Sequence, residues 1–331
     1  MNNNEKTVKV QNVNPSSLIN FKPRYIKCTE SGNITEFVLM ANSPKPFPVK
    51  RISNDYYVVL SGDNAGEVLK YEHSEYKSDS IVSVRRTLAH LRAIINANCD
   101  DEKRLRWVTL TYAENMTDTN RLYNDFRKFF KRFKYWLNKN GLSCPEYISV
   151  VEPQGRGAWH IHIILIFLDK APYIENNSVL APIWGHGFTK IQAVHGVDNI
   201  GAYFSAYLAD MPLDEFKRDN NSHIEYIKFI ELPDETTGES ITKAFVKGAR
   251  LRLYPSNMNI YRCSRGIKKP VVSKLTLKQY KDKKFHAGKL TFSHACSIVA
   301  VSDSVSSSSG SNISDEQILN TISHEYYNKK R

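Results

Sequence analysis

Residues 159–167 read WHIHIILIF, an apolar strand-like segment that carries two histidines two positions apart. Side chains of a β-strand alternate between its faces, so the rings of His160 and His162 point to the same face. Burying two polar rings among isoleucines and leucines is costly unless partners satisfy them, and a metal ion shared by both rings would do so. A hydrogen-bonded pair of structural histidines is the alternative, and the motif taken alone favours it.

Glu152 lies eight residues before His160 and supplies a third possible ligand. Residues 153–157, Pro-Gln-Gly-Arg-Gly, favour a turn, which would join 147–152 and 159–167 in a β-hairpin. The carboxylate would then reach across from the partner strand. Two imidazoles and one carboxylate with open positions suit Mg²⁺ or Mn²⁺ better than a closed zinc site. A solvated carboxylate at the end of a strand is the alternative.

The segments around this hairpin alternate between helical and strand-like patterns. Residues 83–95 have apolar side chains at helical spacing, residues 107–112 alternate like a strand, and Asp118 can cap a long helix. The apolar positions of that helix are Leu122, Phe126, Phe129, Phe133 and Leu137. The later patterns predict a short helix at 179–184, a strand at 188–194 and a helix at 199–211. This order predicts an α+β fold, in which a small antiparallel sheet carries helices on one face.

Two tyrosines, Tyr203 and Tyr207, lie within the helix expected at 199–211. A spacing of four places both phenols on one helical face, one turn apart. A tyrosine, with a pKa of about 10, is a poor nucleophile until a metal polarises the phosphate that it attacks or a neighbour takes its proton. Two core aromatics are the alternative, but the pair follows the histidine strand by about forty residues. Either tyrosine is therefore a candidate catalytic nucleophile.

Three motifs, in this order, resemble those of HUH endonucleases: WVTLTYAEN at 107–115, the histidine strand preceded by Glu152, and YFSAY at 203–207. The resemblance covers about residues 83–270. It points to the replication initiators of filamentous and small isometric phages and of related plasmids. Residues 261–270 resemble a basic segment that is often seen downstream in those proteins.

The resemblance implies an antiparallel HUH core of the RRM-like or ferredoxin-like type and a nicking reaction. In that family the histidine pair holds a divalent ion against the scissile phosphate, and a tyrosine attack leaves a 5′-phosphotyrosine and a free 3′-OH. Carried over, Glu152, His160 and His162 bind Mg²⁺ or Mn²⁺, and Tyr203 and Tyr207 are the nucleophiles. The implied partners are single-stranded or hairpin origin DNA, a host helicase and a DNA polymerase.

One departure from the family concerns lysines near the second tyrosine. Two-tyrosine relatives usually carry a lysine just before that tyrosine and another three residues after it. Ala206 and Asp210 stand at those positions here. How the phenols are activated, and whether both serve, is therefore open.

The chain is strongly basic, with 46 Lys and Arg against 34 Asp and Glu and a formal net charge of +12. Such a charge suits a polyanionic partner. Residues 268–289 hold eight lysines and one acid, and the helix after Asp118 carries a second basic stripe. Solvated surface is the alternative for each segment, but interleaved aromatics favour a DNA track. The predicted DNA contacts are Arg127, Lys131, Lys134, Arg156, Arg265, Lys268, Lys269, Lys281, Lys283 and Lys284.

Composition and punctuation suggest four regions. We expect an N-terminal region of unknown role at 1–80, the endonuclease domain at 81–255, a basic DNA-binding extension at 256–300 and a flexible serine-rich tail at 301–331. The five scattered cysteines form no CxxC pair. The chain shows no secretion signal and no apolar stretch long enough to span a bilayer, so we expect a cytoplasmic protein without a membrane partner.

Three other functions share parts of this pattern. A HIT-type nucleotide hydrolase needs a third alternating histidine, and Ile164 stands at that position. A relaxase or single-strand transposase uses the same chemistry, but the long N-terminal region and residues 261–270 fit replication initiators better. A non-catalytic origin-binding protein with a decayed site is supported by the missing lysines. Covalent trapping on DNA would distinguish it from a nicking enzyme.

Overall fold

A computed structural model divides the chain into two compact units, and each is described by itself. The first unit comprises Met1–Tyr71 and Pro270–Arg331, and the second comprises Glu72–Lys269. The predicted boundaries at residues 80, 255 and 300 stay a prediction. Tyr203, Tyr207 and most of the helix expected around them lie outside the described residues, which are 7–18, 21–44, 48–194, 208, 210–213, 216, 227–233, 240–246, 248–304 and 313–330.

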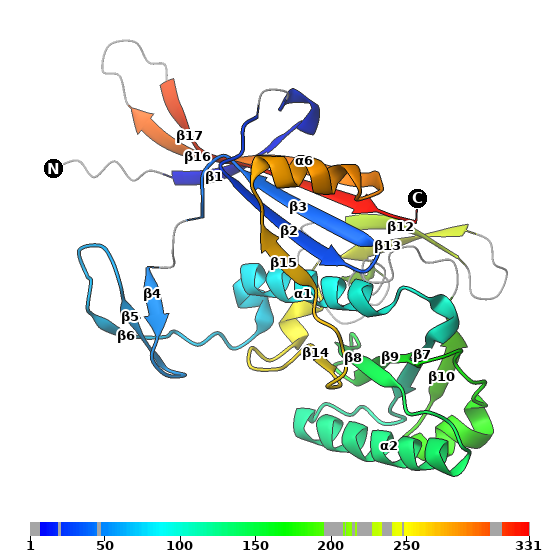
Figure 1. The fold of residues 1–331 in the computed structure, drawn as a ribbon. Helices are drawn as coiled ribbons and strands as arrows, with labels where there is room; N and C mark the ends of the chain where they lie inside the picture. The colour runs from blue at the N-terminus through cyan, green and yellow to red at the C-terminus, as the bar shows by residue number, and fades with distance from the viewer. Residues whose placement is uncertain are drawn as a thin grey trace. The chain divides into compact units, whose positions relative to one another are not determined.

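The second unit is built on a five-stranded antiparallel sheet with the order β10-β7-β9-β8-β14 (Figure 1). The strands are β7 (Leu105–Thr111), β8 (Glu146–Pro153), β9 (Trp159–Ile166), β10 (Thr189–Ala193) and β14 (Tyr261–Cys263). The predicted hairpin is confirmed, since β8 and β9 pair along their whole length. The antiparallel sheet and its helices also confirm the α+β class, whereas the specific HUH core stays a prediction.

Helix α2 (Thr119–Lys139) forms as the sequence predicts. The Asp118 side chain accepts hydrogen bonds from the backbone N–H groups of Asn120 and Arg121, which satisfies two donors at the helix start. The predicted apolar positions are all buried. Each such side chain contributes about 1.5–3 kcal/mol when it leaves water, so packing against the sheet stabilises this helix more than its own propensity does.

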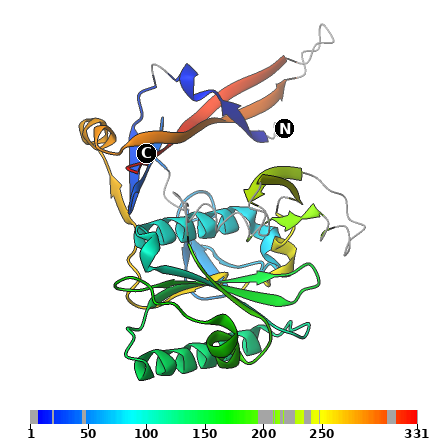
Figure 2. The same cartoon turned by 90° about the vertical axis from the view of Figure 1, so that its right-hand side faces the viewer.

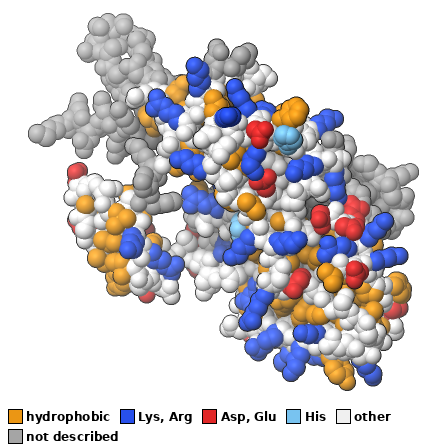
Figure 3. Space-filling model, in the orientation of Figure 1, with side chains coloured by type: hydrophobic (Ala, Val, Ile, Leu, Met, Phe, Trp, Pro, Cys, Tyr) orange, Lys and Arg blue, Asp and Glu red, His pale blue; other side chains and the backbone are white. Residues whose placement is uncertain are grey.

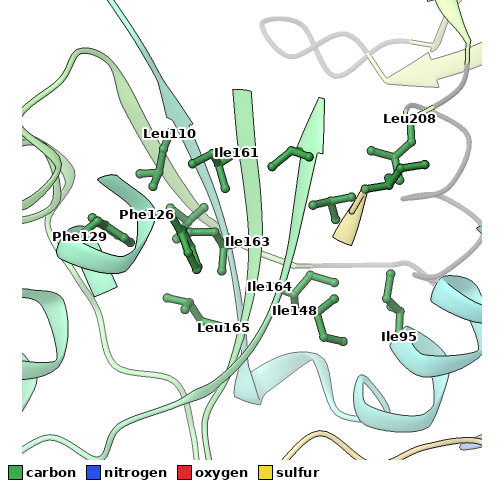
Figure 4. Packing of buried hydrophobic residues seen from close by; sticks show 14 of the residues in the cluster. Ile95, Leu110, Phe126, Phe129, Ile148, Ile161, Ile163, Ile164, Leu165 and Leu208 are labelled. Carbon is green, nitrogen blue, oxygen red and sulfur yellow. The ribbon is translucent and has the colours of Figure 1, made fainter. Parts of the chain in front are cut away.

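Helices cover both faces of the sheet, so the prediction of helices on one face is wrong. In Figure 4, Phe126 and Phe129 of α2 lie beside Ile161 and Ile163, whereas Ile95 of α1 (Ile81–Asn98) lies on the side of Ile148 and Ile164. Figure 2 shows α1 and α2 on opposite sides of the sheet. The reason is local: the second half of β9 is apolar on both faces, and each face needs a cover.

Smaller elements complete the second unit. A three-stranded sheet has the order β11-β13-β12, formed by β11 (Met211–Pro212), β12 (Ile227–Pro233) and β13 (Ser240–Val246). The predicted short helix is α3 (Ala181–Trp184), which ends at Gly185 in the left-handed conformation. Further short turns of helix are η2 (Lys77–Ser80), η3 (Glu102–Arg104), η4 (Asn176–Leu180) and η5 (Leu251–Leu253).

The first unit contains a six-stranded antiparallel sheet with the order β1-β16-β17-β3-β2-β15. Helix α6 (Leu277–Phe285) begins with a capping box formed by Thr276 and Gln279, and its Tyr280 packs edge-on against Phe37 of the sheet. The strands are β1 (Thr7–Val13), β2 (Tyr25–Ser31), β3 (Ile34–Met40), β15 (Val271–Lys274), β16 (Lys289–Ser304) and β17 (Ile313–Asn328), and η1 (Pro15–Ser17) follows β1. A separate three-stranded sheet consists of β4 (Val49–Arg51), β5 (Tyr56–Val59) and β6 (Val68–Lys70).

The end of the chain differs from the flexible tail that its serines suggest. Residues 313–328 form β17, which pairs with β16 on one side and with β3 on the other. The apolar and aromatic side chains of its second half, such as Tyr327, pack into the sheet. The serine-rich residues 305–312 lie outside the described part of the chain. No helix among the described residues is both long and apolar enough to span a membrane.

Candidate active site

The sheet register brings the three predicted ligands to one face. Glu152 of β8 pairs directly with His160 of β9. On the other side of β9, Thr111 pairs with His160 and Thr109 pairs with His162. Directly paired residues project to the same face of a sheet. The carboxylate, both imidazoles and the threonine hydroxyls therefore share one face, as the spacing predicts.

A chain of hydrogen bonds orients His162. The indole Nε1 of Trp107 lies 3.3 Å from Thr109 Oγ1, which lies 3.2 Å from His162 Nδ1. On the other side of the ring, His162 Nε2 lies 2.6 Å from Glu152 Oε2. Because an indole can only donate, Thr109 remains able to donate its own proton to Nδ1, and Nε2 then holds the proton shared with Glu152. This tautomer is assigned from the hydrogen-bond network.

Glu152 is buried yet ionised. Burial by itself raises the pKa of a carboxyl group, but the hydrogen bond from His162 and the charges of His162 and Arg250 outweigh it. The pKa of Glu152 therefore lies below its ordinary value. A buried carboxylate that keeps its charge is a suitable hard ligand for a divalent cation.

His160 is buried and neutral. Burial lowers the pKa of His160 to about 4, although the charge of Glu152 acts in the opposite direction. The neutral imidazole is the form that binds metals. Its Nε2 atom is buried and has no hydrogen-bond partner within the described part of the chain. A buried polar atom without a partner costs about 1–3 kcal/mol, so a ligand at this nitrogen would be favoured.

The donor set fits a divalent ion in its chemistry. Among the described residues, no group of three His, Cys, Asp or Glu side chains is already arranged to hold a metal ion. Glu152 and His162 are hydrogen-bonded to each other, and the ring centres of His160 and His162 lie 6.3 Å apart. The unpartnered nitrogen of His160 nevertheless lies on the same face as a second imidazole and a carboxylate, which is a donor set that Mg²⁺ and Mn²⁺ accept. Metal binding stays a prediction.

Arg250 is a residue of this site that the sequence does not reveal. Its Nη2 lies 3.0 Å from Glu152 Oε1, its Nη1 donates to the carbonyl of Pro153 at 2.6 Å, and its Nε donates to the carbonyl of Asp210 at 2.8 Å. Only 5% of Arg250 is exposed. It follows the weakly patterned segment 240–249, and no signal there distinguishes it from a surface arginine.

The chain directly after the second candidate tyrosine is attached beside Glu152. The Tyr254 hydroxyl lies 2.8 Å from the carbonyl of Val151 and 3.3 Å from the carbonyl of Leu208. Asp210 is held through Arg250 and through its Oδ1, which accepts the N–H of Gly248 at 2.9 Å. The tyrosines are outside the described residues, but Tyr207 is bonded to Leu208, and consecutive Cα atoms lie about 3.8 Å apart.

The predicted DNA contacts of the second unit are exposed in two places. Arg127, Lys131 and Lys134 project from the outer face of α2. Arg156 lies in the hairpin turn beside the site, where its Nε donates to Gln154 Oε1 at 3.1 Å. Arg265, Lys268 and Lys269 are exposed in the segment that follows β14.

The lysines of α6 belong to the first unit and differ in their surroundings. Lys281 is exposed. Lys283 is paired with Glu30, and Lys284 Nζ lies 3.0 Å from Glu325 Oε2. These two side chains therefore hold the helix to its sheet, a role that their sequence pattern does not reveal. Contact with DNA stays a prediction for all three.

With this geometry described, the chain can be compared with known proteins. Residues 105–212 match the family model of the replication-associated protein ORF2. This is a family of phage replication initiators. The matched segment is about a third of the chain and includes Glu152, His160, His162 and both candidate tyrosines. Arg250 and the first unit lie outside it. No curated protein and no solved structure matches the chain.

Proposed function

We propose that this chain is a replication initiator that nicks single-stranded origin DNA with a tyrosine. The reaction leaves a 5′-phosphotyrosine and a free 3′-OH that primes rolling-circle replication. One observation carries the proposal: a buried carboxylate and two imidazoles share a sheet face, one imidazole nitrogen has no described partner, and all three residues fall within the segment that matches the replication-associated protein family. Origin DNA, a host helicase and a polymerase are the partners that this reaction needs, and a cytoplasm is the compartment that supplies them.

Glu152, His160 and His162 would hold the divalent ion, Mg²⁺ or Mn²⁺. When bound, the ion would polarise the scissile phosphate. Thr109 can serve either tautomer of His162, because its hydroxyl accepts a proton from Nδ1 as readily as it donates one. Release of the Nε2 proton would therefore leave the ring oriented for coordination. Arg250 holds the other carboxylate oxygen of Glu152 and fixes its direction.

Tyr207 is our preferred first nucleophile. Its neighbour Leu208 is buried and lies within hydrogen-bond distance of Tyr254, which also bonds to the backbone next to Glu152. In the reaction the phenolic oxygen bonds to phosphorus, the bond from phosphorus to the 3′ oxygen breaks, and that oxygen takes up a proton. Tyr203 would serve one turn earlier in the motif if both tyrosines act.

The departure at Asp210 supports a site arranged differently from that of two-tyrosine relatives. The buried Asp210 carboxylate accepts the N–H of Gly248, and its carbonyl accepts Nε of Arg250. An aspartate at this position thus braces the turn that presents Arg250 to Glu152. We infer that the lysine position of the relatives has been reassigned here to positioning the carboxylate ligand.

Covalent trapping tests the proposal. The full-length protein is incubated with Mn²⁺ and labelled single-stranded oligonucleotides that tile the DNA around its own coding sequence, and the products are separated by denaturing electrophoresis. We expect a protein–DNA adduct, which the double variant Tyr203→Phe/Tyr207→Phe lacks. The control is Tyr173→Phe, at a tyrosine that is 82% exposed on the second unit. The absence of an adduct with the unaltered protein, or an adduct that survives in the double variant, would refute the proposal.

A further inference from the structure

Helix α2 concentrates positive charge on one side. Its 21 residues contain seven Lys and Arg and one acid, a net charge of +6 that equals half of the net charge of the chain. The acid, Asp125, is 5% exposed and lies against the core. Lys and Arg side chains gather over α2 at the lower edge of the molecule in Figure 3. The outer face of the helix is therefore cationic without interruption by acids.

Five of these cations have no carboxylate partner in the part of the chain that the structure describes. Arg121 is paired with Glu114 at 2.6 Å, and Arg132 donates to the carbonyls of Ile183 and Trp184. Those two side chains serve the fold. The remaining five, all exposed, are Arg127, Lys128, Lys131, Lys134 and Lys139.

This charge pattern acts against the stability of the helix itself. Arg127 and Lys131 lie one turn apart, as do Lys131 and Lys134, and like charges at these spacings repel each other. A solvated face gains nothing from that arrangement, whereas a face that binds an anionic polymer does. The pattern therefore points to a ligand.

The cationic face lies across the sheet from the candidate active site. Phe126 and Phe129 of α2 pack on the face that carries Ile161 and Ile163 (Figure 4). The histidines alternate with those isoleucines along β9 and so project from the opposite face. A strand that lies at the histidines cannot be the one that the outer face of α2 contacts, unless it passes around an edge of the sheet.

We propose that the outer face of α2 binds the phosphate backbone of double-stranded DNA, independently of sequence, while the strand to be cut lies on the other face of the sheet. The proposal rests on the proposed function, since it places the duplex that flanks a nicking site. Single-strand tracks interleave cations with rings on which bases stack, but this face exposes one ring to water, that of Tyr135. From Arg127 to Lys139 the cations extend over about 18 Å, which is roughly half of a turn of B-DNA.

The test compares two triple variants of the full-length protein. Arg127→Gln/Lys131→Gln/Lys134→Gln removes three charges from α2, and Lys22→Gln/Lys50→Gln/Lys70→Gln removes three exposed charges from the first unit. The probe is a fluorescent duplex of about 30 base pairs and arbitrary sequence, and anisotropy is recorded between about 50 and 300 mM KCl. We expect the α2 variant to bind about tenfold or more weakly, and the slope of log affinity against log salt to fall by about 2–3, because each lost phosphate contact contributes about 0.9. The first-unit variant should keep the slope of the unaltered protein.

Two further measurements make the result decisive. Thermal unfolding should show that the α2 variant is at least as stable as the unaltered protein, since the substitutions relieve repulsion. Adduct formation with a short single-stranded oligonucleotide that spans only the nick should be unchanged. An unaltered duplex slope would overturn the proposal, and so would an equal loss of binding to the short single strand. If the unaltered protein forms no adduct, the proposed function fails, but the duplex slopes still decide whether α2 binds DNA.

Discussion

Replacing Arg250 by methionine tests how the candidate site is held together. The substitution keeps most of the side-chain volume and removes the 3.0 Å ion pair with Glu152 and the hydrogen bonds to the carbonyls of Pro153 and Asp210. Removal of one partner of a buried ion pair costs about 3–5 kcal/mol, because the other charge remains buried without compensation. With a urea dependence of about 2 kcal/mol per molar, the unfolding midpoint should fall by roughly 1.5–2.5 M.

Tryptophan fluorescence is a suitable assay because it reports on the second unit alone. All four tryptophans of the chain, at positions 107, 136, 159 and 184, lie between residues 72 and 269. The double variant Glu152→Gln/Arg250→Met should recover about 1–3 kcal/mol relative to Arg250→Met, since the unpaired charge is gone. Arg265→Met, at an exposed arginine of the same unit, should stay within about 0.5 kcal/mol of the unaltered protein. An Arg250→Met variant as stable as Arg265→Met would refute this reasoning.

Three other predictions concern single side chains. His160→Ala should abolish adduct formation and weaken Mn²⁺ binding in calorimetry while duplex affinity stays within about twofold, because the basic surfaces supply that affinity; undiminished Mn²⁺ binding would remove this histidine from the ligand set. Lys281→Gln should lower the salt slope for DNA by about one, whereas Lys283→Gln, which loses its pairing with Glu30, should leave it unchanged; equal effects would show that the pairing is irrelevant to DNA binding. Burial raises the pKa of Cys99 to about 12, so at pH 8 a disulfide reagent should react quickly with the exposed Cys144, and Cys144→Ser but not Cys99→Ser should remove the fast phase.

Local patterns predict the elements around the candidate site. Asp118 and the apolar stripe of α2 are contained within one helix, and the turn at 153–157 sets the register that pairs Glu152 with His160. These features depend on neighbours within about twenty residues. A single sequence carries such information in its spacing and in its turn residues.

Long-range partners are not visible in the same way. Arg250 contacts a carboxylate 98 positions earlier, and a buried arginine has the same letter as an exposed one. Lys283 and Lys284 form part of a basic run, yet their acidic partners stand in β2 and β17. The second cover of the sheet was missed for a related reason, because α1 was identified as a helix without any local signal for the face on which it packs. The roles of Tyr203 and Tyr207 stay predictions.

The strand order of the first unit has a consequence for synthesis of the protein. Met40 of β3 pairs with Ile322 of β17, 282 positions later along the chain. At about 5–20 residues per second, the β2–β3 hairpin waits roughly 15–60 s for this neighbour to be translated. During that interval one edge of β3 offers unpaired backbone groups to any extended segment nearby, including those of other nascent chains. Slower translation should therefore increase aggregation during expression, and a polypeptide truncated before residue 313 should keep this edge open permanently.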